Sequence, residues 1–267
     1  MGEIQRTSSF LNFNTVILIV IGAAIGLLMG LAFYFDWLFL LTIPIILAVL
    51  YIAMYHIDLL FLAIVFFAPL SINIEEHTDQ FGLFIPTEPL LFGIMILLVF
   101  YQFKSRLIKS EFFRHPIILI LIGYLAWLVI CSITSTHPLV SFKSLISRLW
   151  FIIPVLFFGP VLLKREHAIS SFFWLLSIGT VLVILFTLLN HASYSFGEKE
   201  SHWVMSPFYK DHTIYGAAVA LVVPFPIMLF LMKKQTPLYS FILGVLLLII
   251  LLGLYFSYTR AAWLSVL

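Results

Sequence analysis

The sequence predicts an all-α fold: a polytopic integral membrane helical bundle with about nine to ten transmembrane helices and a cytoplasmic N-terminus. Of 267 residues, 63% are hydrophobic and 10% are charged, and the mean hydropathy is +1.16. A soluble domain of this composition has too few polar side chains to cover its apolar surface. Apolar stretches of helical length also recur along the whole chain, and in lipid such stretches form helices because their backbone groups must bond one another.

Nine apolar stretches are candidate spans, since about 20 helical residues cross the hydrocarbon layer. The first is too long for a signal-peptide core and lacks a cleavage site, so we interpret it as a retained span. The first three are separated by almost nothing, and one of them could be half-buried or re-entrant. We expect residues 1–267 to form a single transmembrane domain. The candidate spans are Thr15 to Phe35, Trp37 to Tyr55, Ile57 to Ile72, Pro89 to Phe103, Pro116 to Ile133, Leu149 to Leu163, Ala168 to Asn190, Ile214 to Met232 and Leu238 to Phe256.

Positive residues in the loops predict the orientation, because they concentrate on the cytoplasmic side. With the N-terminus inside and the spans alternating, nine of the fourteen Lys and Arg residues but only four of the twelve acidic residues lie inside. One miscounted span would scramble this bias, which therefore supports the alternation. The inner cations are Arg6, Lys104, Arg106, Lys109, Arg114, Lys164, Arg165, Lys233 and Lys234. Function in loops is then expected outside, where the longer loops lie: Asn73 to Glu88, Ser135 to Arg148 and His191 to Thr213.

Several function classes have no support in the sequence. The formal net charge of +2 and the lack of a basic, aromatic-rich surface argue against nucleic-acid binding. Motifs for an ATP motor, a zinc enzyme and a serine hydrolase are absent, so we predict no metal and no cofactor. No predicted span carries a charged residue near its middle, which disfavours a proton- or sodium-coupled transporter.

Two polar segments near the predicted outer boundary are candidate functional sites. Arg260 follows the ninth span, where it could simply anchor the helix end or could bind phosphate oxygens. Lys210, Asp211 and His212 precede the eighth span in SPFYKDHTIYG, where Asp211 or Thr213 could cap the helix. Lys210 near a helix N-terminus suits an anion, and His212 is a candidate acid or base.

Two further outer segments carry polar candidates. The segment EEHTD, with Glu75, Glu76, His77 and Asp79, could ligate a divalent metal but is by default a solvated acidic loop. Glu88, between two prolines, is placed to face a cavity. Arg148 precedes the sixth span, and because it is a cation on the outer side we predict it to be an anion contact rather than an orientation signal.

The last quarter of the chain resembles the O-antigen ligase and O-antigen polymerase family. FSYTRAAWLSVL is similar to that family's Ser-Arg-Gly-Ala segment, with Tyr-Thr before Arg260 and Ala261 where glycine is commoner. PFYKDHTIYGAAVALVVPFPIMLFL is similar to the preceding polar turn and proline-containing helix. The similarity covers residues 206–267, and we expect the natural protein to continue beyond Leu267.

The resemblance implies a metal-independent membrane glycosyltransferase of the bacterial inner membrane with a periplasmic active face. It implies transfer of a glycan from undecaprenyl pyrophosphate to an acceptor, which is the lipid A core or another lipid-linked repeat. By the same resemblance Arg260 binds the pyrophosphate, Lys210 or His212 takes the other anion-binding position, and the main base lies beyond the chain end. Together with the position of Arg148 on the outer side, this predicts Arg260, Lys210 and Arg148 as pyrophosphate contacts and His212 as a catalytic candidate. A lipid-linked glycan transporter, another permease or a non-catalytic scaffold are the alternatives.

Overall fold

A computed structural model of the chain describes residues 22–74, 83–164, 167–232 and 236–266. It divides after Ile57 into two compact units, which are described separately. The first unit holds a helix over Gly22–Tyr34, the short 3-10 helix η1 (Leu38–Leu41) and α2 (Thr42–Tyr55). Each of these helices is shorter than a full membrane crossing requires.

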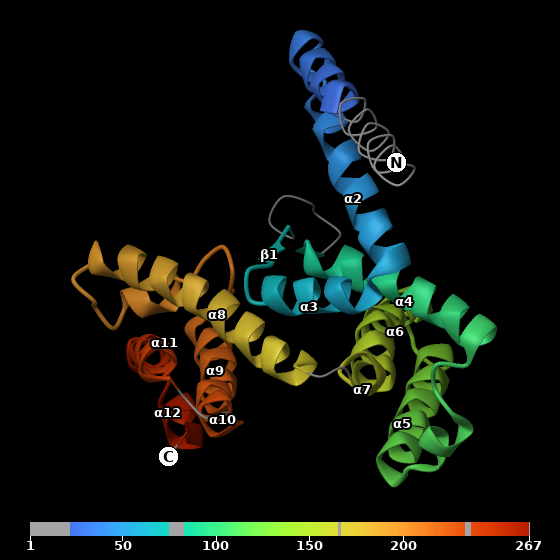
Figure 1. Ribbon diagram of the computed structural model, residues 1–267. Coiled ribbons are helices and arrows are strands. Elements are labelled where there is room, and N and C mark those ends of the chain that lie inside the picture. The colour runs from blue at the N-terminus through green and yellow to red at the C-terminus, as the bar shows by residue number, and fades with distance from the viewer. Residues whose placement is uncertain (1–21, 75–82, 165–166, 233–235, 267) are drawn as a thin grey trace, which may run out of the picture. The chain divides into compact units, whose positions relative to one another are not determined.

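The second unit is almost wholly helical (Figure 1). A two-stranded antiparallel sheet pairs Ile72 with Ile85 and Asn73 with Phe84. The elements in chain order are α3 (Ile57–Phe67), β1 (Ile72–Asn73), β2 (Phe84–Ile85), α4 (Thr87–Ser105), η3 (Ser110–Arg114), α5 (Pro116–Ile133), α6 (Pro138–Ile152), the π-helix η4 (Ile153–Phe158), α7 (Gly159–Leu162), α8 (Ala168–Ala192), η5 (Glu200–His202), α9 (His212–Val222), α10 (Pro224–Met232), α11 (Pro237–Tyr255) and α12 (Arg260–Val266).

Six helices of this unit are long and apolar enough to cross a membrane, and they confirm the last six predicted spans as helices. They are Thr87–Ser105, Pro116–Ile133, Pro138–Leu162, Ala168–Ala192, His212–Met232 and Pro237–Tyr255. The third predicted span is wrong, because α3 has 11 residues and rises only about 16 Å before the β1–β2 hairpin follows. The protein is thus a helical membrane protein with six such helices in the part described.

The sixth predicted span begins too late. Its helix starts at Pro138 rather than Leu149, because a proline at the first helical position has the backbone angle that a helix needs. The extra turns are polar, with serines and Lys143 among the apolar residues, and a hydropathy argument assigns such turns to the loop. The consequence is that Arg148 lies inside the long helix Pro138–Leu162 and not in front of it.

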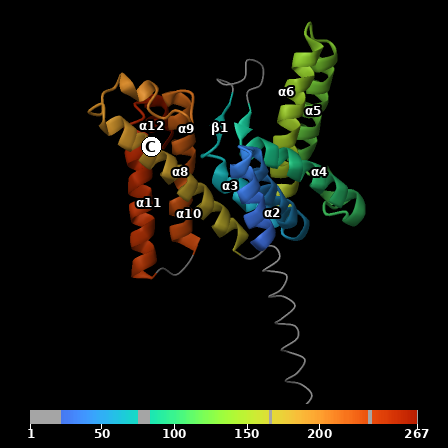
Figure 2. The same ribbon diagram turned by 90° about the horizontal axis from the view of Figure 1, so that it is seen from above.

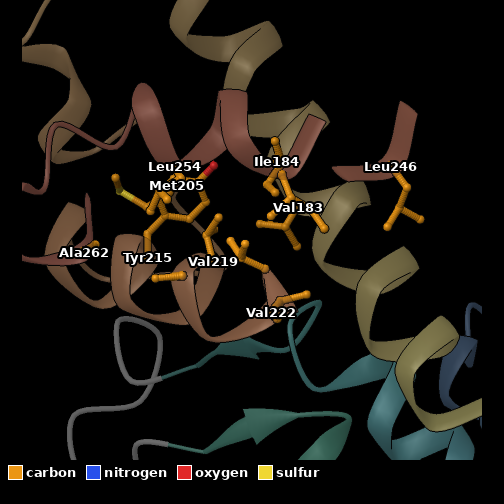
Figure 3. Close-up of a cluster of buried hydrophobic side chains, with 12 residues drawn as sticks. Val183, Ile184, Met205, Tyr215, Val219, Val222, Leu246, Leu254 and Ala262 are labelled. Atoms are coloured by element: carbon orange, nitrogen blue, oxygen red, sulfur yellow. The ribbon is translucent and has the colours of Figure 1, made fainter. Parts of the chain in front are cut away.

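Helices α8 to α12 pack around one hydrophobic cluster (Figure 3). Helix α8 contributes Val183 and Ile184, and the segment before α9 contributes Met205, which is 1% exposed. Gly253 on α11 lets Ile184 approach, because a Cβ at Gly253 would lie 2.7 Å from the Ile184 Cγ2 atom. The other members are Tyr215, Val219, Ala220, Val222, Val223, Leu246, Ile250, Leu254 and Ala262. This cluster fixes the relative positions of the helix ends that carry the candidate site.

Candidate functional site

Helix α9 begins with a side-chain cap at Asp211. The Asp211 carboxylate accepts hydrogen bonds from the backbone N–H groups of Thr213, at 2.8 Å, and Ile214, at 2.9 Å. The Thr213 hydroxyl also donates to this carboxylate. These bonds, that of the Thr213 hydroxyl foremost, hold the pKa of Asp211 below its usual value. The carboxylate therefore occupies two of the N–H groups that the sequence suggested for an anion, so a ligand here must use side chains.

Helix α12 begins directly beside the start of α9. The Thr259 hydroxyl donates to the backbone carbonyl of His212 at 2.9 Å, although the two residues are 47 positions apart. The helices approach closely because position 216 is glycine: a Cβ at Gly216 would lie 2.8 Å from the Thr259 Cβ atom and 3.0 Å from the Ser257 hydroxyl. The two segments that carry the family resemblance thus meet at one place, and Arg260 follows the residue that joins them.

The cations of this place are accessible. Lys210 and Arg260 are exposed, and within the described part of the chain neither side chain has a hydrogen bond or an ion pair. A guanidinium and an ammonium that remain free can bind an anion without first breaking a protein contact. We define the N-terminal ends of α9 and α12, with Lys210, His212 and Arg260, as the α9–α12 site.

His212 faces a second histidine that the sequence analysis missed. The His202 and His212 rings lie 4.0 Å apart, centre to centre, with planes inclined at 70°. The Nδ1 atom of His212 is buried and has no hydrogen-bond partner among the described residues. His202 belongs to the short helix η5, ten positions away, and no spacing in the sequence connects it to the start of α9. Two close imidazoles cannot both be cationic at low cost, so one of them remains neutral and able to accept a proton.

The segment between α8 and α9 is held over this site by specific bonds. The Tyr258 hydroxyl donates to the Phe196 carbonyl at 2.9 Å, and both residues have positive φ angles, 51° and 56°. Aromatic residues seldom adopt this conformation, so the surrounding contacts impose it. The Asn190 amide donates to the Val204 carbonyl at 2.9 Å, and His191, 0% exposed, is hydrogen-bonded to the Gly197 carbonyl at 2.8 Å. These bonds therefore fix the segment to α8 and to the turn that precedes α12.

The aromatic residues near Arg260 pack on the protein. The rings of Tyr255 and Trp263 are stacked with centres 5.9 Å apart, and the Trp263 indole donates to the Leu254 carbonyl at 2.7 Å. These contacts bind α12 to the end of α11. The two aromatics therefore fix the direction in which α12 leaves the end of α11.

Arg148, the third predicted anion contact, belongs to another part of the unit. It projects from α6 toward α5, where its guanidinium donates to the Tyr124 hydroxyl at 2.9 Å. Helix α6 packs on α4, α5 and η4, and no described contact joins Arg148 to α9 or α12. The prediction that no span carries a charged residue near its middle is therefore wrong, because Arg148 lies near the middle of the 25-residue helix Pro138–Leu162 and contacts Tyr124, which lies halfway along α5.

The remaining candidates carry no site in the described residues. The segment with Glu75, Glu76, His77 and Asp79 lies outside the part of the chain that the structure describes. Within the ranges that are described, no three His, Cys, Asp or Glu side chains come close enough to hold a metal ion.

Comparisons of the chain with protein-family models, curated proteins and solved structures return no match.

Proposed function

We propose that this protein is a membrane glycosyltransferase that moves a glycan from undecaprenyl pyrophosphate to an acceptor hydroxyl at the periplasmic face of the bacterial inner membrane. The acceptor is the lipid A core or another lipid-linked repeat. The single observation that carries the proposal is the α9–α12 site. Two segments that resemble the ligase and polymerase family, 47 positions apart, meet through the Thr259–His212 bond and present an exposed arginine and lysine at one end of the helices.

The chemistry needs few groups from the protein. The acceptor oxygen forms a bond to the anomeric carbon of the donor glycan, the bond from that carbon to the pyrophosphate oxygen breaks, and its electron pair leaves with the pyrophosphate. Arg260 and Lys210 neutralise the charge that develops on the leaving group, which is a large contribution in many transfer reactions. The acceptor proton must pass to a base, for which His212 beside His202 is the candidate in this chain.

Replacement of Arg260 tests the proposal. In proteoliposomes that contain the undecaprenyl pyrophosphate-linked glycan and an acceptor, Arg260→Ala should lower transfer about 10²- to 10³-fold, because a leaving-group contact is lost. Arg260→Lys should retain an intermediate rate, since it keeps the charge but not the two-pronged donor geometry. Arg106→Ala, at the end of α4, is the matched control and should transfer normally. Undiminished transfer by a correctly inserted Arg260→Ala protein would exclude the proposed role.

A lipid-linked glycan transporter is the second candidate, and one observation favours it. Arg148 lies inside a membrane-length helix, and ionisable residues at such positions often mark transport pathways. This candidate predicts that labelled glycan crosses sealed vesicles while no new glycosidic bond forms. Product analysis of the same vesicles distinguishes the two functions, because only the transferase consumes the acceptor.

A further inference from the structure

The hairpin of α5 and α6 holds a cation at membrane depth. Both views show the two helices side by side (Figures 1 and 2), and the Arg148 guanidinium is bonded to the Tyr124 hydroxyl between them. Helix α5 is about 27 Å long, close to the thickness of the hydrocarbon layer, and Tyr124 is its ninth residue of 18. A charged group at this depth is costly in lipid, so it needs a polar cavity and a partner.

Two pockets meet at Arg148. One, of about 330 Å³, is lined by Ser132, Ser141, Ser144 and Arg148 together with apolar residues of both helices. The other, of about 550 Å³, is lined by Ser144, Ser147 and Arg148 and by residues of α4. Ser141, Ser144 and Ser147 follow one another at three-residue spacing, so they form a polar stripe along one face of α6. Ser144 is shared by both pockets, and no hydrogen bond of its hydroxyl is found in the described part of the chain.

A carboxylate stands on the other wall of the larger pocket. Glu88, in the first turn of α4, lines this pocket with Arg148. Its carboxylate forms no ion pair with Arg148 among the described residues. A cation and an anion that face the same cavity without meeting leave room for a group that satisfies both. The apolar remainder of the lining, including Trp150 and Phe151, suits a hydrocarbon chain.

We call the larger pocket, which is lined by Glu88, Ser144, Ser147 and Arg148, the α4–α6 pocket. We propose that it binds the headgroup of a lipid phosphate that carries hydrogen-bond donors next to its phosphate. Arg148 and Ser144 bind the phosphate, Glu88 accepts from the donor, and the hydrocarbon chain lies along the apolar wall. The donor is an ammonium in phosphatidylethanolamine and a hydroxyl in a glycosylated polyprenyl phosphate, so the same chemistry fits a bilayer lipid or a lipid-linked glycan. The site is separate from the α9–α12 site, and the proposal does not depend on the transfer reaction.

Lipid retention measured by native mass spectrometry tests the proposal. The full chain is released from nanodiscs made of equal parts phosphatidylethanolamine and phosphatidylcholine, whose quaternary ammonium has no N–H donor. We expect the protein to retain about tenfold more phosphatidylethanolamine than phosphatidylcholine, because one charge-assisted hydrogen bond provides a ratio of that size. A second arm adds a glycosylated polyprenyl phosphate to the discs, and its exclusive retention would identify the lipid-linked glycan as the source. Equal retention of both phospholipids without retention of the polyprenyl phosphate would overturn the proposal.

Variants separate binding from a purely structural role of Arg148. Arg148→Gln should lose the retained lipid, Glu88→Gln should lower the preference for phosphatidylethanolamine, and Lys143→Gln, which removes a neighbouring α6 cation outside both pockets, should change neither. Tyr124→Phe removes only the hydroxyl that Arg148 contacts and leaves the guanidinium in the pocket, so lipid retention should stay within about threefold of that of the native protein. This variant is the one to measure if Arg148→Gln does not insert into the membrane. Unchanged retention in Arg148→Gln, or equal loss in Lys143→Gln, would contradict the proposal. Arg260→Ala should leave the retention of phosphatidylethanolamine unchanged whether or not it abolishes transfer.

Discussion

The helices α8 to α12 and the helices α4 to α6 place their cations in opposite ways. In the first group, Lys210 and Arg260 stand at helix starts, where a side chain reaches water without crossing lipid. In the second group, Arg148 lies well within a 25-residue membrane-length helix and is held by a hydroxyl of the neighbouring helix. The first arrangement suits a ligand that arrives from the aqueous side, and the second suits a ligand that arrives from the bilayer.

The two regions also differ in packing. The α8 to α12 group is closed around a cluster of side chains with exposures of 0% to 9%, and close glycine contacts bring its helices together. The α4 to α6 group has two pockets that adjoin Arg148 and carry serines in their lining, whereas the pocket between α10 and α11 is lined by apolar residues apart from Ser240 and glycine. Rigid packing positions a reactive group accurately, whereas a cavity accommodates a ligand. The difference predicts that substitutions at the packed helix contacts of the first group act through structure and that those at the pocket lining of the second group act through binding.

The largest expected structural effect is that of Gly216→Val. The new side chain would overlap Thr259 and separate α9 from α12. We expect a loss of about 2–3 kcal/mol in stability, in the upper part of the range for overpacking against buried side chains. Thermal unfolding in detergent micelles measures this loss. Gly123→Val on α5, where a Cβ meets nothing within 4 Å, is the matched control. Equal melting temperatures for the two variants would show that α9 and α12 do not approach as described.

Thr259→Val tests the bond that joins the two resembling segments. Valine keeps the shape of threonine but leaves the His212 carbonyl without this donor, so we expect a loss of about 1–2 kcal/mol. If the α9–α12 site performs transfer, the transfer rate of Thr259→Val should fall by more than the loss of folded protein accounts for, because Arg260 moves with the start of α12. Thr259→Ser, which keeps the hydroxyl, should restore both the melting temperature and the rate. Normal stability and normal transfer in Thr259→Val would show that the Thr259–His212 bond is not needed to hold the site together.

The sequence predicts much of the α9–α12 site because its signals are local. Asp211 followed by an apolar run indicates a capped helix, and Arg260 after a span indicates a boundary cation. His202 and the Thr259–His212 bond were beyond prediction, because both depend on how the segment between α8 and α9 folds back. Arg148 was misplaced for a different reason: serines lower the hydropathy of the first turns of α6 without preventing a helix.

The smallest expected effect concerns the cap of α9. Asp211→Ala should lower stability by about 1 kcal/mol, and Asp211→Asn by less, since asparagine caps a helix nearly as well. Because the native bonds lower the pKa of Asp211, its contribution is complete above the unfolded-state pKa of about 3.9 and is lost as the pH falls through the lower folded-state value. The melting temperatures of the native protein and Asp211→Asn should therefore differ by a constant amount from pH 7 to about pH 5 and converge toward pH 3. Because the carboxylate is largely solvated, the convergence of the two melting temperatures should be small. The start of α6 has no side-chain cap, so its residue-resolved hydrogen exchange should not differ between the two proteins at any pH. A difference that grows as the pH falls would contradict this prediction and would mean that another titrating group governs this helix end.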